Sequence, residues 1–283
     1  LDWPKADAFA SRFAKNRLDY SILQAVKGNN HQSSLGSEQR DGLLQEFLQS
    51  NQFLIVDGKH EALIDPGGDL TYTPLSVAAS RYMNIRDMDY VFASHQDPDI
   101  IASLPRWLMH TRCQVGVSRL WSRFLPHLAS SYVTGKMGEQ LQARILGVAD
   151  EGKVLPFAGT ELWVLPAHFL HSVGNFSFYD PLSGILFSGD VGASLGGEEG
   201  RVDNFADHCH SMQGFHRRYM ASNRACRLWV AMVRKLAPRM IVPQHGGYFQ
   251  DDNVGRFLDW LAQLECGVDL LDSGSYRLPS ADC

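Results

Sequence analysis

The sequence of 283 residues has no long apolar run, and none approaches the roughly 20 residues that a helix needs to span a bilayer. Its start, from Leu1 to Lys5, lacks the charged and apolar regions of a signal peptide. We therefore expect a protein with no membrane partner.

Cysteine is also scarce. The five cysteines are an odd, widely spaced set without a CxxC pair. A disulfide scaffold needs paired cysteines in an oxidising compartment, and many zinc sites use CxxC spacing. Neither applies here, so we expect a reducing cytoplasm.

A basic excess is missing as well. Lys and Arg number 26 against 31 Asp and Glu, which gives a formal net charge of -5. Because nucleic-acid binders carry a clear basic excess, this balance argues against a nucleic-acid partner. With 45% hydrophobic and 20% charged residues, the chain has the composition of an ordinary globular protein.

Strand-like apolar segments separated by turn residues recur along the chain. Residues 51–67 predict a hairpin whose two strands are joined at Asp57 and Gly58. Buried-strand patterns follow at 89–94, 161–166, 174–179, 184–188 and 240–243, with helical spacing between and after them. Residues 1–50 predict a helical and loop extension packed on this body. The pattern indicates one α+β domain over residues 1–283.

Potential metal ligands follow four of these strands. They are His95, Asp97, Asp99, His171, Asp190 and His245. Alternate side chains of an extended segment point the same way, so the first three can converge. Small residues such as Gly189 and Gly192 flank Asp190 and allow the backbone to approach a metal closely. Ends of strands and their loops commonly assemble such sites.

These motifs resemble the metallo-β-lactamase superfamily over residues 51–263. The ordered motifs are His95-x-Asp97-x-Asp99, His171, Ser188-Gly-Asp190 and Pro243-x-His245-Gly. An acidic residue at Asp97, where hydrolases usually have a second histidine, is similar to the flavodiiron branch. So is the run from Phe215 to Tyr219 ahead of the last strand. The resemblance implies a four-layer αββα sandwich with two mixed sheets flanked by helices.

The resemblance also implies a position for each ligand. It places His95, Asp97 and His171 on one metal ion, Asp99 and His245 on the other, and Asp190 between both. Half of these ligands are carboxylates, which favours iron over the His- and Cys-rich sets typical of zinc. We therefore expect a di-iron centre, with zinc as the alternative.

One position departs from the family pattern. Both the hydrolases and the flavodiiron proteins normally have a histidine directly after the second carboxylate, where this chain has Ile100. The second metal then keeps only Asp99, Asp190 and His245 unless another histidine replaces the missing one. The candidates are His168, His31 and His208.

The resemblance further implies a function. Flavodiiron enzymes draw electrons from a flavin in an attached flavodoxin-like domain, whereas this sequence ends soon after the last expected ligand. We therefore expect no bound flavin. The chain resembles stand-alone oxygen-binding di-iron proteins associated with bacterial chemotaxis, which implies a dioxygen sensor with a signalling protein or a second copy as partner. The alternatives are an O2 or NO reductase served by a separate flavoprotein, and a dimetal hydrolase.

Overall fold

Two six-stranded sheets form the centre of the molecule. The computed structural model describes residues 19–24, 50–128, 135, 143–195 and 200–278. The first sheet has strand order β1-β2-β3-β4-β5-β6 and the second β12-β11-β10-β9-β8-β7. The first contains β1 (Asp19–Gln24), β2 (Asn51–Asp57), β3 (His60–Ile64), β4 (Tyr90–Phe92), β5 (Gln114–Ser118) and β6 (Ile145–Val148). The second contains β7 (Lys153–Phe157), β8 (Thr160–Pro166), β9 (Phe176–Asp180), β10 (Ile185–Gly189), β11 (Met240–Pro243) and β12 (Phe249–Gln250).

Both sheets are mixed. In the first sheet β1, β2 and β3 pair antiparallel, and β3 to β6 pair parallel. In the second sheet all neighbours pair antiparallel except β10 and β11, which are parallel. The predicted hairpin at Asp57 and Gly58 is the connection between β2 and β3, and Gly58 has a positive φ of 63°.

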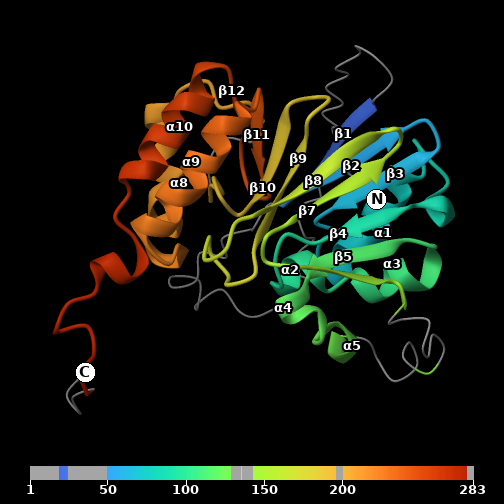
Figure 1. Ribbon diagram of the computed structural model, residues 1–283, viewed down its shortest axis with the longest axis horizontal. Coiled ribbons are helices and arrows are strands. Elements are labelled where there is room, and N and C mark those ends of the chain that lie inside the picture. Colours follow the sequence, from blue (N-terminus) through green and yellow to red (C-terminus); the bar gives the residue numbers. More distant parts are fainter. Residues whose placement is uncertain (1–18, 25–49, 129–134, 136–142, 196–199, 279–283) are drawn as a thin grey trace, which may run out of the picture.

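Helices cover the outer face of each sheet, which gives four layers (Figure 1). On the first sheet these are α1 (Tyr72–Ala79), α2 (Pro98–Ile101), α3 (Leu104–His110), α4 (Arg119–Ser122) and α5 (Leu125–Leu128). On the second they are α8 (Phe205–Tyr219), α9 (Asn223–Leu236) and α10 (Asp252–Gln263). Short 3-10 turns occupy Asp69–Thr71, Ile85–Asp87 and Gly267–Leu270. No helix in the described part of the chain is long and apolar enough to cross a membrane.

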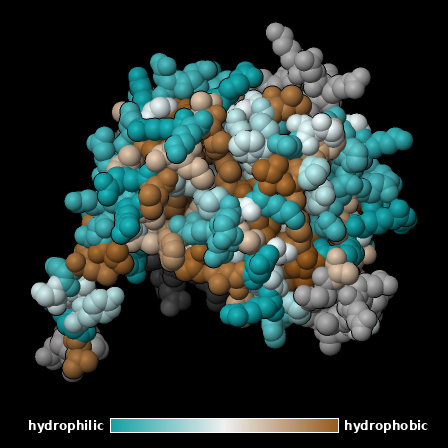
Figure 2. Space-filling model, in the orientation of Figure 1, coloured by the Kyte–Doolittle hydropathy of each residue, from teal (hydrophilic) through white to brown (hydrophobic). Residues whose placement is uncertain are grey.

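Alternating side chains separate three hydrophobic clusters. On β2, Phe53 and Ile55 face the second sheet, while Leu54 between them faces the helices of its own side. This alternation is what the pleat of a strand imposes when both of its faces are buried. In the second sheet's helix layer, α9 buries Trp229 and Val233 and exposes basic residues. Figure 2 shows mostly hydrophilic residues along the left edge, where this helix layer lies, with some hydrophobic residues among them. The predicted αββα sandwich is confirmed.

The N-terminal prediction is partly wrong. Residues 1–50 were expected to be helix and loop, but β1 adds an edge strand by pairing along the full length of β2. Its sequence, Asp-Tyr-Ser-Ile-Leu-Gln, is short and only partly alternating, so its strand character depends on the partner strand. The rest of this expected extension, residues 1–18 and 25–49, lies outside the described residues.

The strands that precede the six potential metal ligands all end at one edge of the sandwich. In the second sheet β8, β10 and β11 run in the same direction, because β9 is antiparallel to both β8 and β10. The end of β4 meets this edge, since the N–H of Phe176 donates to the carbonyl of Ser94 at 2.9 Å. Loops from both sheets therefore meet here.

Candidate metal centre

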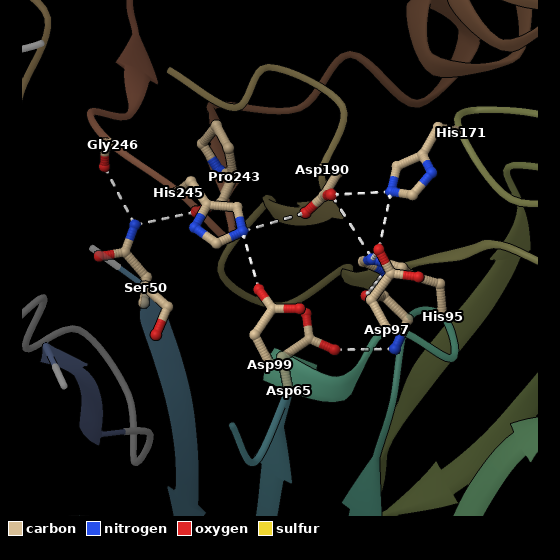
Figure 3. A network of polar contacts seen from close by, with 12 residues as sticks. Ser50, Asp65, His95, Asp97, Asp99, His171, Asp190, Pro243, His245 and Gly246 are labelled. Atoms are coloured by element: carbon tan, nitrogen blue, oxygen red, sulfur yellow. Dashed lines mark hydrogen bonds and ion pairs between the residues drawn. The ribbon is translucent and has the colours of Figure 1, made fainter. Parts of the chain in front are cut away.

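All six residues selected from the sequence lie together at this edge, around the carboxylate of Asp190 (Figure 3). The Nε2 atoms of His171 and His95 lie 3.0 and 3.5 Å from Asp190 Oδ2. The Nε2 atom of His245 lies 3.7 Å from the other oxygen, Oδ1. Asp190 thus presents one oxygen to each of two groups of side chains.

The first group surrounds Asp190 Oδ2. Asp97 adds a second carboxylate, whose Oδ2 lies 3.7 Å from His95 Nε2 and 3.5 Å from His171 Nε2. Donor atoms of His95, Asp97 and His171 all lie within 4.8 Å of one another, a separation that one metal ion can span. We call these three residues with Asp190 the first side.

The second group surrounds Asp190 Oδ1. Asp99 lies in the first turn of α2, and its Oδ2 is 3.3 Å from His245 Nε2. The next residue, Ile100, is fully buried among the apolar side chains between the first sheet and its helices. Asp99 and His245 with Asp190 form what we call the second side.

A contact at its Nδ1 atom orients the imidazole of His95. Its Nδ1 lies 2.9 Å from Ser94 Oγ, which leaves Nε2 facing the carboxylates. The backbone N–H of Ser94 donates to Asp65 Oδ1 at 2.7 Å. Asp65 follows β3 and is itself buried, so the first sheet fixes His95 through two neighbouring strands.

Asp190 lies in a tight turn that needs glycine on both sides. Gly189 and Gly192 both have positive φ, and a Cβ on Gly192 would meet Phe249 and Pro243 at 2.9 Å. The N–H of Gly192 donates to Nε2 of His216 at 2.9 Å. The other ring nitrogen of His216 lies 2.9 Å from the carbonyl of Met212, one turn back in α8. The buried ring is therefore neutral and acts as an acceptor for the turn that carries Asp190.

His171 lies in the loop between β8 and β9. Asn175 closes this loop, donating from its amide to the Leu170 carbonyl and accepting from the N–H of Ser172. The hydroxyl of Ser172 donates to Gln96, which lies between His95 and Asp97, and so connects the two ligand-bearing loops.

Two aromatic rings of α8 pack on the imidazole of His171. The ring centroids of Phe215 and Tyr219 lie 5.9 and 5.6 Å from that of His171. They also stack on each other, with 4.9 Å between centroids. This wall shields His171 from solvent, whereas Asp97 and Asp99 keep 39% and 38% of their side chains exposed. The cluster is therefore reached from solvent past the two aspartates.

The charges in the cluster depend on one another. Burial favours neutral His95, but the carboxylates of Asp190 and Asp97 outweigh it and raise the pKa of His95 well above its ordinary range. Burial likewise opposes ionised Asp190, yet the surrounding imidazoles hold its pKa well below the usual value. Burial raises the pKa of Asp65 to about 6, against the opposing hydrogen bond from Ser94.

The donor set fits a pair of metal ions. His95 Nε2 and Asp190 Oδ1 are buried and have no hydrogen-bond partner among the described residues. Such atoms are costly to bury unless something else binds them. Three imidazoles and two further carboxylates lie around the two oxygens of Asp190. This donor set suits two divalent ions of the iron or zinc type.

The histidines considered as replacements for the missing ligand have other contacts or are not described. His168 Nε2 lies 2.7 Å from the carbonyl of Asp150, and its ring packs on Phe176. His208 is buried in α8 with its ring against Phe249. His31 lies outside the described residues.

Sequence reasoning missed the residues that hold the ligand loops. Asn175 and His216 carry no motif, because their partners are backbone groups of loops distant in sequence. The sequence marks Asn51 only as the first residue of a predicted strand. The run from Phe215 to Tyr219 resembles the flavodiiron branch, but only the structure shows that it packs on His171.

Fold and cluster together define a metallo-β-lactamase-like sandwich of the flavodiiron-related kind. A family model described as ODP family beta lactamase matches residues 48–246. The chain belongs to this ODP family.

Solved structures agree. A structure described as the peroxy diiron species of chemotaxis sensor ODP is 33% identical, with a TM-score of 0.75, and covers 92% of this chain and 96% of that chain. The apo state of chemotaxis sensor ODP from T. denticola is 34% identical, with a TM-score of 0.74, over 92% and 95% of the two chains. Rubredoxin oxygen:oxidoreductase from Desulfovibrio gigas shares the fold at 14% identity, with a TM-score of 0.65, over 86% of this chain and 59% of that chain. No curated protein sequence matches.

Proposed function

We propose that this chain holds two iron ions and senses dioxygen in bacterial signalling. The observation that carries the proposal is the pair of ligand groups on the two oxygens of Asp190, in a chain 33% identical to a protein described as a diiron chemotaxis sensor. His95, Asp97 and His171 would hold the first iron, Asp99 and His245 would hold the second, and Asp190 would contribute to both positions.

Two ferrous ions, when bound, supply the redox chemistry through which the protein responds to dioxygen. The protein provides the surroundings for it. Asp190 is buried and ionised, so it offsets positive charge where no water can do so. Phe215 and Tyr219 keep water from His171, and the exposed edges of Asp97 and Asp99 provide the entrance for a small gas.

Sensing requires that the response be passed on. We infer a cytoplasmic signalling protein as the partner, because the similar solved structures are described as chemotaxis sensors. A second copy of the chain remains the other candidate partner.

The test is anaerobic reconstitution with ferrous iron, followed by elemental analysis and addition of dioxygen. We expect about two iron ions per chain, as the six ligands imply. We also expect a visible absorption band that appears when oxygen is added and then persists. An unchanged spectrum contradicts the sensor. Continuous oxygen or NO consumption with an added flavoprotein reductase would instead identify a reductase, and ester or phosphodiester hydrolysis by the zinc form would identify a hydrolase.

A further inference from the structure

The second side depends on His245, which follows the four-residue strand β11. A residue of the opposite sheet holds this segment. Asn51, at the start of β2, donates from its side-chain amide to the carbonyls of Pro243 and Gly246, each at 3.0 Å. Its backbone N–H donates to the carbonyl of Gln244 at 2.6 Å. Figure 3 shows the contacts that reach Pro243 and Gly246 on either side of His245.

We propose that Asn51 is the positioning residue for His245 and thereby determines whether the second metal position fills. The inference rests on the proposed di-iron function. Asn51 does not touch the metal position. It acts through the backbone on both sides of the ligand.

The physical argument begins with the carbonyls. A buried carbonyl needs a donor, and a donor that serves two carbonyls fixes the distance between them. Because the carbonyls of Pro243 and Gly246 bracket His245, the Asn51 amide limits the directions in which that imidazole can point. Asn51 is 3% exposed, so water cannot readily replace it.

The second side has little tolerance for a displaced ligand. It has Asp99 and His245 besides the shared Asp190, and Ile100 is packed into the outer core. A shift of His245 therefore removes a large part of the binding energy at this position. The first side has His95, Asp97 and His171, and none of these lies on the segment that Asn51 holds.

The chain offers a matched control. Asn253 in α10 is also buried, and its amide donates to two consecutive carbonyls, those of Val202 at 2.6 Å and Asp203 at 3.4 Å. Asn51→Asp and Asn253→Asp make the same isosteric change, which replaces a donor by an acceptor. Only the first change is made beside a ligand.

Each variant is titrated anaerobically with ferrous iron, and iron per chain and Mössbauer spectra are recorded. We expect Asn51→Asp to bind the second equivalent roughly 10- to 100-fold more weakly, as is usual when a ligand loses its support. When iron is limiting, one of the two Mössbauer signals is then lost from the Asn51→Asp protein. Its affinity for the first equivalent, and both affinities of the Asn253→Asp protein, match those of the wild type. Wild-type affinity for both equivalents, or equal weakening of both, overturns the proposal.

Should Asn51→Asp not fold, Asn51→Ala and Asn253→Ala repeat the comparison without a buried charge, and the same outcomes decide. The wild type separates this inference from the proposed function. If it binds no iron, the proposed function fails. If it binds two equivalents and Asn51→Asp or Asn51→Ala does so equally well, only the role of Asn51 fails.

Discussion

The two oxygens of Asp190 have unequal surroundings. Near Oδ2 lie the imidazoles of His95 and His171, with Asp97 against both, whereas near Oδ1 lies His245 with Asp99 against it. Asp190 therefore has more potential metal ligands near Oδ2 than near Oδ1. Two metal ions held by these groups would therefore differ in affinity, even though Asp190 would contact both.

The supports of the two sides also differ in chemistry. The turn that carries Asp190 is held by the imidazole of His216, which can take up a proton. The segment that carries His245 is held by the amide of Asn51, which cannot. Acid is therefore expected to act on one support and not on the other.

Removing the shared carboxylate should have the largest effect. Asp190→Asn keeps the shape of the side chain but removes its charge and one of its two acceptor oxygens. We expect iron content to fall from about two ions per chain to almost none, because both positions lose a ligand. Elemental analysis after anaerobic reconstitution measures this. A variant that retains one tightly bound iron would show that one side does not need the bridge.

Removing one expected ligand from each side in turn tests directly whether the two sides differ in iron affinity. Asp99→Ala should leave about one iron per chain, because the first side keeps its three ligands and Asp190. His171→Ala should leave less than that, since the second side alone has too few ligands to retain its ion. Iron content and Mössbauer spectra of both variants provide the measurement. Equal retention in the two variants would show that the two sides are equivalent.

The sequence was sufficient to select the six residues of the cluster for a physical reason. His95, Asp97 and Asp99 are spaced two apart after a buried strand, and Asp190 is flanked by Gly189. Local spacing determines where such side chains point, and family resemblance supplied the pairing between segments. The edge strand β1 was not predicted, because its partner rather than its own pattern makes it a strand.

The supporting residues could not be found in the same way. Asn51 lies 192 residues before Pro243, and His216 lies 24 residues after Gly192. Both bind backbone groups, which every residue has, so no residue pattern marks the partner. The packing of Ile100 could not be predicted either. The sequence shows that this position lacks the histidine usual in related families, but not which core cluster the isoleucine side chain joins.

Acid should lower the stability of the folded protein because of His216. Burial lowers the pKa of His216 to about 4, whereas in the unfolded chain it has the ordinary value near 6.5. Between these values the unfolded chain binds a proton that the folded protein does not, so the free energy of unfolding falls as the pH drops from about 6.5 to about 4. The loss at the acid end is roughly 3 kcal/mol.

The control for this prediction is His216→Gln, whose side-chain oxygen can accept from Gly192 but does not titrate. Denaturant unfolding of both metal-free proteins at several pH values measures the difference. We expect the wild type to lose roughly 3 kcal/mol more than His216→Gln over this range. Parallel curves for the two proteins would mean that His216 takes up its proton equally in the folded and unfolded states.

The smallest effect is expected where the second side lacks a ligand. Ile100→His restores the residue usual in related families, but Ile100 is fully buried among apolar side chains of the outer core. An imidazole there loses apolar packing and has no polar partner, so the free energy of unfolding should fall by about 2 kcal/mol. Because the side chain at this position packs into the core, iron affinity at the second side should stay unchanged. Denaturant unfolding and iron titration of the variant check both statements, and tighter binding of the second iron would show that the new ring turns out of the core to reach the metal.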